Sequence, residues 1–285
     1  MGGQVNSGLW YEDIIGAEMV RLFKFMITAL VLLVLVGYPQ NYVSAGNDVG
    51  VILMHGKGVT ADEGSPMGKL AETLESEGFI VLAPDMPWHE LRIWDKSFDE
   101  SMAEIDEYVA ELKSKGAKKI VVGGHSIGAN AAIGYGARRE GLAGVLAIAP
   151  GHVPEVTGFQ SRMDHDYMRA RDLVDKGRGN ETVDFKDINQ GRTSEVSAKA
   201  KDYLSWYDPE GPAVMPKNAA ALKPGTALMW VIGEKDVMLR FGRGKNYAFD
   251  RAPAHPKSIY VVVPGGHRVT PQKGENAIIN WLKGL

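Results

Sequence analysis

From residue 46 onward, short apolar runs alternate with helix-like segments, and this alternation constrains the fold more than any other feature. Six runs have the length and the apolar character of strands. Strands that are apolar along their whole length are typical of a parallel sheet covered on both faces. Right-handed crossovers then predict an α/β three-layer sandwich with a mostly parallel six-stranded sheet. The predicted strands are residues 49–54, 79–83, 119–122, 142–149, 227–232 and 258–263.

The segments between the strands carry helix signals. Apolar residues recur three or four positions apart, which places them on one helix face. Gly78 and Gly116 provide stop signals for the first two of these segments. The predicted helices are residues 66–78, 97–115, 129–138 and 276–282.

Residues 151–225 interrupt the alternation. This stretch is polar, and it is too long for a plain connection between two sheet elements. We predict a cap or lid insertion over the site of an otherwise continuous domain at 46–285. The simpler alternative is one or two helices with a long surface loop.

Residues 1–45 have the pattern of a signal peptide preceded by extra residues. Arg21 and Lys24 form a basic start, residues 26–36 are an apolar run, and residues 43–45 supply small side chains for cleavage. The run is shorter than the roughly 17–25 residues of a membrane-spanning helix. We therefore expect a protein exported to the periplasm or secreted, with no stable membrane span after cleavage. An uncleaved N-terminal membrane anchor is the alternative.

A candidate nucleophile follows the third predicted strand. The segment Gly124-His125-Ser126-Ile127-Gly128 matches G-x-S-x-G, with a strand before it and a small-residue helix after it, as a nucleophile elbow requires. Glycines are needed there because side chains would collide with the neighbouring strand and helix. We predict Ser126 as the nucleophile; a structural serine in a glycine-rich turn is the alternative.

A candidate base and a candidate acid follow two other strands. His267 comes directly after the sixth strand and can accept the serine proton near neutral pH. Asp236 follows the fifth strand and would hold the imidazole tautomer, with Glu234 as the alternative carboxylate. All three positions lie beyond the carboxyl ends of parallel strands, where such sheets bind their ligands.

An oxyanion formed by serine attack needs backbone N–H donors. We predict Ile127 as one donor and Lys57 or Gly58, in the loop after the first strand, as the other. His55 is expected to brace that loop. Trp88 and His89 follow the second strand and are possible substrate-binding residues.

Composition excludes several other classes of function. The formal net charge is −3 and there is no basic excess to neutralise phosphates, so we expect no nucleic-acid partner. The chain has no cysteine, which rules out disulfides, thiolate metal sites and a cysteine nucleophile. We see no metal-ligand spacing, and no cofactor is implied.

The motifs H-G-x-G, G-H-S-I-G, G-x-x-D and G-G-H, each after a strand, resemble those of the α/β-hydrolase superfamily from about residue 49 to the end. The resemblance implies that Ser126, Asp236 and His267 form a triad. Members of the superfamily often carry an additional strand pair ahead of the H-G loop. This chain has almost no room for one, so a compact version is expected.

These features predict a serine hydrolase, most specifically a carboxylesterase that cleaves small or polar esters through an acyl-enzyme on Ser126. A peptidase, amidase or thioesterase with the same triad is one alternative. A non-catalytic envelope binding protein on the same fold is the other. The expected partner is a small-molecule substrate, and the sequence leaves the oligomeric state open.

Overall fold

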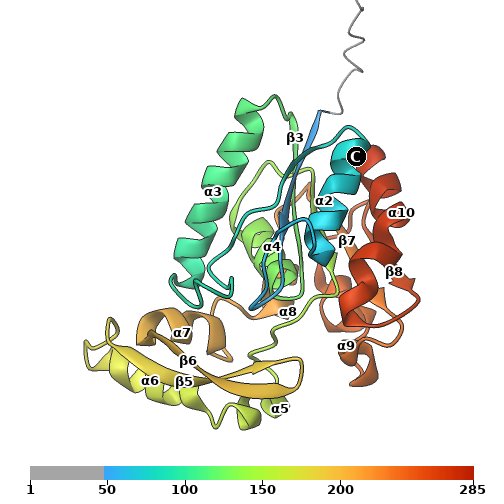
Figure 1. Cartoon of the computed structure of the whole chain (residues 1–285). Coiled ribbons are helices and arrows are strands. Elements are labelled where there is room, and N and C mark those ends of the chain that lie inside the picture. Colours follow the sequence, from blue (N-terminus) through green and yellow to red (C-terminus); the bar gives the residue numbers. More distant parts are fainter. Residues whose placement is uncertain (1–47) are drawn as a thin grey trace, which may run out of the picture. The chain divides into compact units, whose positions relative to one another are not determined.

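The computed structural model describes residues 48–285, in which six strands form one wholly parallel sheet (Figure 1). The strand order is β2-β1-β3-β4-β7-β8. The predicted fold class is confirmed, and all five strand pairs are parallel. The predicted signal peptide at 1–45 lies outside the described residues. The strands are β1 (Val49–Met54), β2 (Ile80–Leu82), β3 (Lys119–His125), β4 (Gly144–Ile148), β7 (Ala227–Gly233) and β8 (Ile259–Val263).

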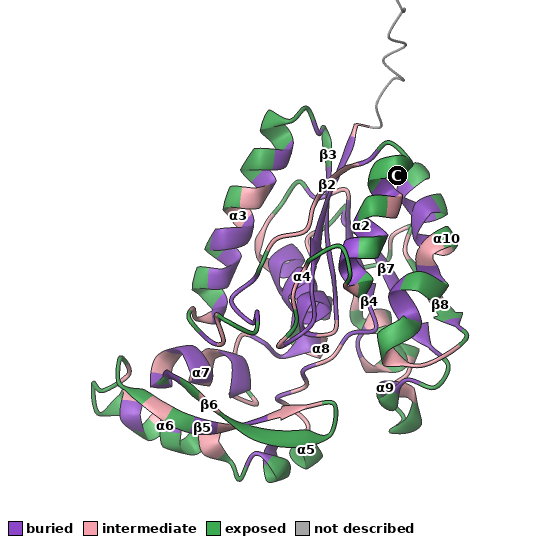
Figure 2. Cartoon of the chain, in the orientation of Figure 1, coloured by how far each residue is buried: buried purple, intermediate pink, exposed green. Residues whose placement is uncertain are grey.

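Helices cover both faces of the sheet because successive strand residues point to opposite sides. In β1, Ile52 and Met54 belong to a core shared with helices α3, α4 and α8. Val51 and Leu53 belong to a second core shared with α2 and α10. The central strands are accordingly buried (Figure 2). The helices are α2 (Pro66–Ser76), α3 (Phe98–Ser114), α4 (Ile127–Arg138), α8 (Met215–Ala220) and α10 (Thr270–Lys283).

Local signals set most of the helix ends. Ser97 and Glu100 form a reciprocal capping box at the start of α3. Gly116, with φ 98°, follows the end of that helix in the left-handed conformation that glycine tolerates. Helix α4 begins at Ile127 and α10 at Thr270, both earlier than predicted, so each starts close to a candidate site residue.

Within the predicted insertion at 151–225, residues 157–207 form a separate layer of short elements beside the carboxyl ends of the strands, whereas α8 packs on the body of the domain (Figure 1). Beyond helices, this stretch contains an antiparallel hairpin that the sequence analysis did not predict. Stacked rings join the hairpin to α7: Phe185 stacks on Tyr203 at 4.3 Å and Tyr203 on Tyr207 at 4.0 Å between ring centroids. The elements are α5 (Thr157–Arg162), α6 (Asp166–Asp175), β5 (Thr182–Asn189), β6 (Arg192–Lys199) and α7 (Ala200–Tyr207), followed by α8.

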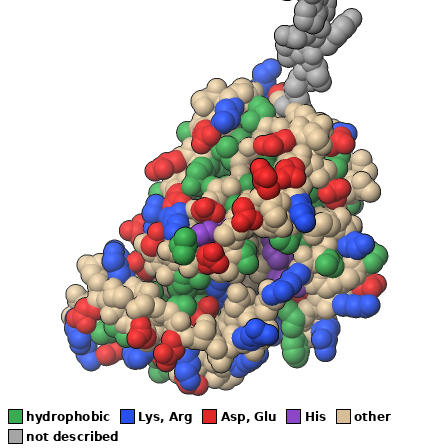
Figure 3. Space-filling model, viewed as in Figure 1, with side chains coloured by type: hydrophobic (Ala, Val, Ile, Leu, Met, Phe, Trp, Pro, Cys, Tyr) green, Lys and Arg blue, Asp and Glu red, His purple; other side chains and the backbone are tan. Residues whose placement is uncertain are grey.

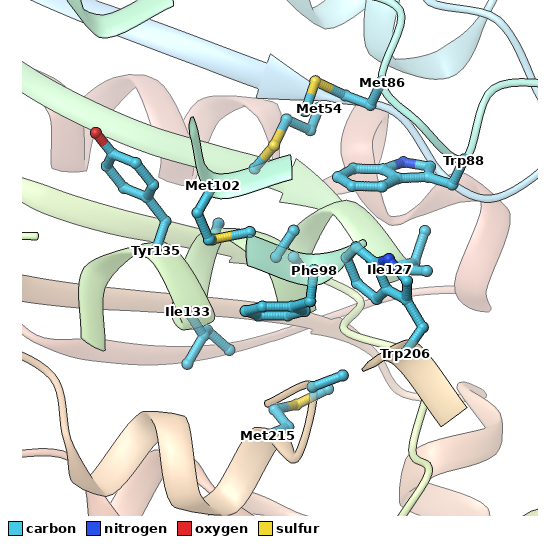
Figure 4. Packing of buried hydrophobic residues seen from close by; sticks show 14 of the residues in the cluster. Met54, Met86, Trp88, Phe98, Met102, Ile127, Ile133, Tyr135, Trp206 and Met215 are labelled. Carbon is cyan, nitrogen blue, oxygen red and sulfur yellow. The ribbon is translucent and has the colours of Figure 1, made fainter. Parts of the chain in front are cut away.

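This layer, which we call the cap, is fixed to the body of the domain through buried aromatic rings. Trp206 of α7 packs against Phe98 at 4.8 Å and against Trp88 at 5.4 Å between ring centroids, and Figure 4 shows the three rings in one cluster. The Phe98 amide also donates to Ser205 Oγ at 2.9 Å. The cap is therefore continuous with the core on the α3 side of the sheet.

The surface carries charges of both signs. On the face seen in Figure 3, acidic and basic side chains are interspersed over the body and the cap. Within residues 48–285, no helix is long and apolar enough to cross a membrane.

Candidate active site

Ser126 occupies a strained turn between β3 and α4. Its backbone has φ 58° and ψ −117°, a conformation that non-glycine residues rarely adopt. The flanking glycines allow the turn to pack: a Cβ on Gly124 would lie 2.7 Å from Met54 O, and one on Gly128 would lie 2.6 Å from the same oxygen. The local geometry is that of a nucleophile elbow, in which the strand-to-helix turn exposes the serine hydroxyl.

His267 and Asp236 meet at the same edge of the sheet. His267 begins the short 3₁₀ helix η3 (His267–Val269) after β8, and Asp236 caps the short helix α9 (Val237–Arg240) after β7. His267 Nδ1 donates to Asp236 Oδ2 at 2.8 Å. The second oxygen of the fully buried carboxylate accepts from the Met238 amide at 2.8 Å. This arrangement holds the ring and leaves His267 Nε2 as the nitrogen that can accept a proton.

The alternative acid, Glu234, makes no such contact. Its side chain is exposed and lies 4.0 Å from Lys235 Nζ. Among the two carboxylates considered from the sequence, only Asp236 reaches the His267 ring.

Ser126 Oγ and the His267 ring lie close to each other, because both are near the position that a Cβ on Gly151 would occupy. A Cβ on Gly151 would lie 2.9 Å from Ser126 Oγ and 3.6 Å from His267 Cε1. The Gly151 amide donates to Ser126 O at 3.0 Å and keeps this loop against the elbow. Within residues 48–285, no hydrogen bond joins Ser126 Oγ to the His267 ring. Such bonds are often long in free enzymes and tighten when substrate binds.

His125, which the sequence shows only as the variable residue of G-x-S-x-G, contacts the ring and the backbone of His267. Its ring lies 4.8 Å from that of His267 between centroids, and His125 Nε2 donates to the His267 carbonyl at 3.0 Å. Burial, followed by the nearby His267, lowers the pKa of His125 to about 3. The ring is therefore neutral at neutral pH and can hold the backbone of His267 without adding charge.

The structure narrows the predicted oxyanion donors. Of the two alternatives in the loop after β1, the Gly58 amide donates to Trp88 O at 2.9 Å. Among the described residues, the amides of Lys57 and Ile127 donate to no acceptor. These two amides remain as the candidate pair.

The loop that carries Lys57 is braced by His55, as expected. His55 Nδ1 donates to Gly56 O at 2.7 Å, while His55 Nε2 accepts from the Met86 amide at 2.9 Å. Burial lowers the pKa of this ring, which suits a neutral side chain with both nitrogens occupied.

Trp88 and His89, predicted as possible substrate-binding residues, serve packing and local hydrogen bonds in this structure. Trp88 is fully buried, and its Nε1 donates to His55 O at 2.7 Å (Figure 4). His89 is also buried, and its Nδ1 accepts from the Leu91 amide at 3.1 Å. A substrate contact by either ring has no support here.

The part of the chain that the structure describes contains no group of three or more His, Asp or Glu side chains placed to hold a metal ion. The site is instead a strained serine, a histidine and a buried carboxylate at the carboxyl ends of β3, β8 and β7. Such a set can transfer an acyl group through the serine.

Comparison with known proteins places the chain in a family. The model of the alpha/beta hydrolase family matches residues 51–275, so the chain belongs to this family. No curated protein matches the sequence significantly.

Three solved structures are similar in fold. A monoacylglycerol lipase from Paleococcus ferrophilus is 21% identical, with a TM-score of 0.59 over 84% of this chain and 95% of that one. A highly thermostable carboxyl esterase from Bacillus coagulans, solved in complex with glycerol, is 15% identical, with a TM-score of 0.57 over 82% and 89%. Est1E from Butyrivibrio proteoclasticus, solved with ferulic acid, is 17% identical, with a TM-score of 0.53 over 82% and 86%. At these identities the likeness shows the fold alone.

Proposed function

We propose that the protein is a serine hydrolase that cleaves carboxylic esters through an acyl-enzyme on Ser126. One observation carries this proposal: the strained serine lies near a histidine that Asp236 holds by its Nδ1. A serine that served only the turn would need neither the base nor the buried carboxylate.

Each residue has a distinct role in the proposed reaction. His267 Nε2 takes the hydroxyl proton as Ser126 Oγ attacks the ester carbonyl carbon, and the amides of Ile127 and Lys57 stabilise the oxyanion. The intermediate collapses, and the departing alcohol leaves with the proton from His267. Water then attacks the acyl-enzyme by the same route, which releases the acid and restores the serine.

Two observations favour esters that are small or polar. The similar structures include a lipase and a carboxyl esterase, and the surface of the cap carries many charged residues (Figure 3). We propose an exported location from the signal-peptide pattern of residues 1–45. A peptidase, an amidase or a thioesterase would use the same three residues, because the fold supports many leaving groups.

Turnover of p-nitrophenyl esters by the purified protein tests the proposal. We expect Ser126→Ala and His267→Ala each to lower kcat by about 10⁴-fold or more, because the nucleophile and the base act as a unit. Glu234→Gln is the matched control: it changes the exposed carboxylate two positions from Asp236 and should leave kcat within about twofold.

The outcomes separate the alternatives. A Ser126→Ala variant that keeps full turnover would remove this serine from the mechanism. A folded parent protein without activity on esters, amides or thioesters would favour the non-catalytic binding protein.

A further inference from the structure

The side chain of Lys57 is buried and fully partnered by the cap. Its Nζ donates to the Asp187 carboxylate, to Ile188 O at 2.9 Å and to Tyr207 OH at 3.2 Å. The Lys57 and Asp187 side chains are only 7% and 4% exposed. The ammonium also lies 5.5 Å from the centroid of the Trp94 ring. A charged side chain from the loop after β1 is thus held inside the base of the cap.

The backbone of the same residue is held by the next position of the hairpin. The side-chain Nδ2 of Asn189 donates to Lys57 O at 3.1 Å. Three consecutive residues at the end of β5, 187–189, therefore hold Lys57 by its ammonium and by its carbonyl group. The Lys57 amide is left as the free polar group of its backbone.

The hairpin turn reaches the other side of the site as well. Arg268 Nε donates to Gln190 Oε1 at 2.7 Å, and Arg268 directly follows His267. The end of β5 and the turn after it thus contact both the loop of the candidate oxyanion donor and the loop of the candidate base.

Lys57 and Asp187 form a buried ion pair, and separating the two charges would be unfavourable. Burial acts to raise the pKa of Asp187, but the charge of Lys57 and hydrogen bonds from Lys57 and Tyr207 outweigh burial and keep this pKa below its usual value. Either partner alone would leave an uncompensated buried charge, which is strongly unfavourable. The pair therefore fixes the distance between the loop after β1 and the cap.

An ion pair that served only to attach the cap could involve any residue of the sheet body. The Lys57–Asp187 pair involves the residue whose backbone amide is a candidate oxyanion donor. We propose that Asp187 and Tyr207 act as positioning residues, which hold the Lys57 amide at the oxyanion through its buried side chain. This inference rests on the proposed function, because it assigns a part of the same reaction to the cap.

The double variant Lys57→Met/Asp187→Leu tests the proposal without creating a lone buried charge, since both members of the pair become apolar together. Tyr207→Phe removes a single hydroxyl and serves as the milder variant. Arg178→Met is the control: it breaks an exposed ion pair with Glu181 elsewhere in the cap. For each protein, kcat and KM are measured on p-nitrophenyl acetate, together with hydrogen exchange of the peptides covering 55–60 and 127–138.

The double variant should lose about 10- to 100-fold in kcat, the range of a displaced oxyanion donor, while KM stays within about threefold. Amide exchange should become faster at 55–60 and stay unchanged at 127–138. Tyr207→Phe should move kcat in the same direction by a smaller factor, and Arg178→Met should match the parent. A merely structural role would not give this split between kcat and KM.

Each other result overturns the proposal in a recognisable way. A double variant with kcat within about twofold of an active parent removes the positioning role and leaves the proposed function intact. A raised KM at constant kcat assigns the hairpin to substrate binding instead. If the double variant does not fold, an unchanged kcat in Tyr207→Phe decides against the proposal. A parent that neither turns over esters nor reacts at Ser126 overturns the proposed function and this role with it.

Discussion

Ser126 Oγ lies beside Gly151, which has no side chain. A methyl group on Gly151 would approach the hydroxyl to 2.9 Å and would also contact the His267 ring. The positions of the candidate nucleophile and base therefore depend on a neighbouring glycine.

We expect Gly151→Ala to lower kcat by about tenfold or more, because a small displacement of the serine or the histidine disturbs their alignment. Gly158→Ala is the matched control, since a Cβ there, in helix α5, meets no atom within 4 Å. Ester turnover and thermal unfolding of both variants check this. Equal kcat values in the two variants would show that Gly151 does not shape the site.

The residues of the candidate site could be predicted because each follows a strand. Ser126, Asp236 and His267 lie at carboxyl ends of parallel strands, and the topology brings those ends together. The choice between Lys57 and Gly58 could not be made from the sequence, because the Gly58 amide bonds to the carbonyl of Trp88, thirty positions further along the chain. The sequence carries no local signal for such a contact.

At the scale of elements, β3, α4 and β1 pack so closely around the elbow that backbone meets backbone. A Cβ on Gly128 would lie 2.6 Å from Met54 O and 2.7 Å from His55 O. Carbonyl groups of a central strand and of the loop that follows it cannot move aside as a flexible side chain would.

Gly128→Ala should therefore lower the free energy of unfolding by at least about 1–3 kcal/mol, the usual cost of overpacking a filled core. Urea unfolding measures this change, again beside Gly158→Ala, which should differ little from the parent. A Gly128→Ala variant as stable as the parent would mean that the helix and the strand are not in this close contact.

The hairpin of the cap is the element that the sequence analysis missed. Both strands are largely polar, β6 is mostly exposed, and in β5 the buried Asp187 interrupts the alternation of apolar and polar residues. The sequence does carry one signal for the hairpin, the dipeptide Gln190-Gly191 at its turn. Both residues have positive φ, as a two-residue type I′ hairpin turn requires. Gln-Gly is a weaker indicator of that turn than Asn-Gly or Asp-Gly.

At the scale of the whole molecule, the sheet was predictable because strands buried on both faces read as continuous apolar runs. Strand lengths were less so: the second strand is Ile80–Leu82 rather than 79–83, and the fourth is Gly144–Ile148 rather than 142–149. Strand ends are set by pairing with neighbours, which a single sequence does not reveal. The arrangement of the cap could not be predicted either, because it depends on aromatic contacts between residues far apart in the sequence.

The folded molecule buries three histidines as neutral rings, and this makes its stability depend on pH. Burial, followed by the nearby His267, lowers the pKa of His125 to about 3, and burial, followed by the charge of Lys57, lowers that of His152 to about 3. Burial also lowers the pKa of His55. In the unfolded chain the rings take up protons below about pH 6.5, while the folded chain excludes them. Stability is therefore complete above that pH and is lost as the pH falls toward 3.

We expect the free energy of unfolding to fall by roughly 1.4 kcal/mol per pH unit for each of His125 and His152 across the upper part of this window. Urea unfolding at a series of pH values between neutral and about pH 5 measures the change of unfolding free energy with pH. His125→Gln should reduce that slope by the contribution of one bound proton, roughly 1.4 kcal/mol per pH unit. A stability that stays constant over this range would contradict the neutral, buried state of these rings.

The central claim is that Ser126 is an activated nucleophile. Labelling of the purified protein with a fluorescent fluorophosphonate, followed by peptide mass spectrometry, tests this most directly, beside the Ser126→Ala and His267→Ala variants. We expect a single adduct on Ser126 in the parent and none in either variant. An adduct on another residue, or no adduct on the folded parent, would contradict it.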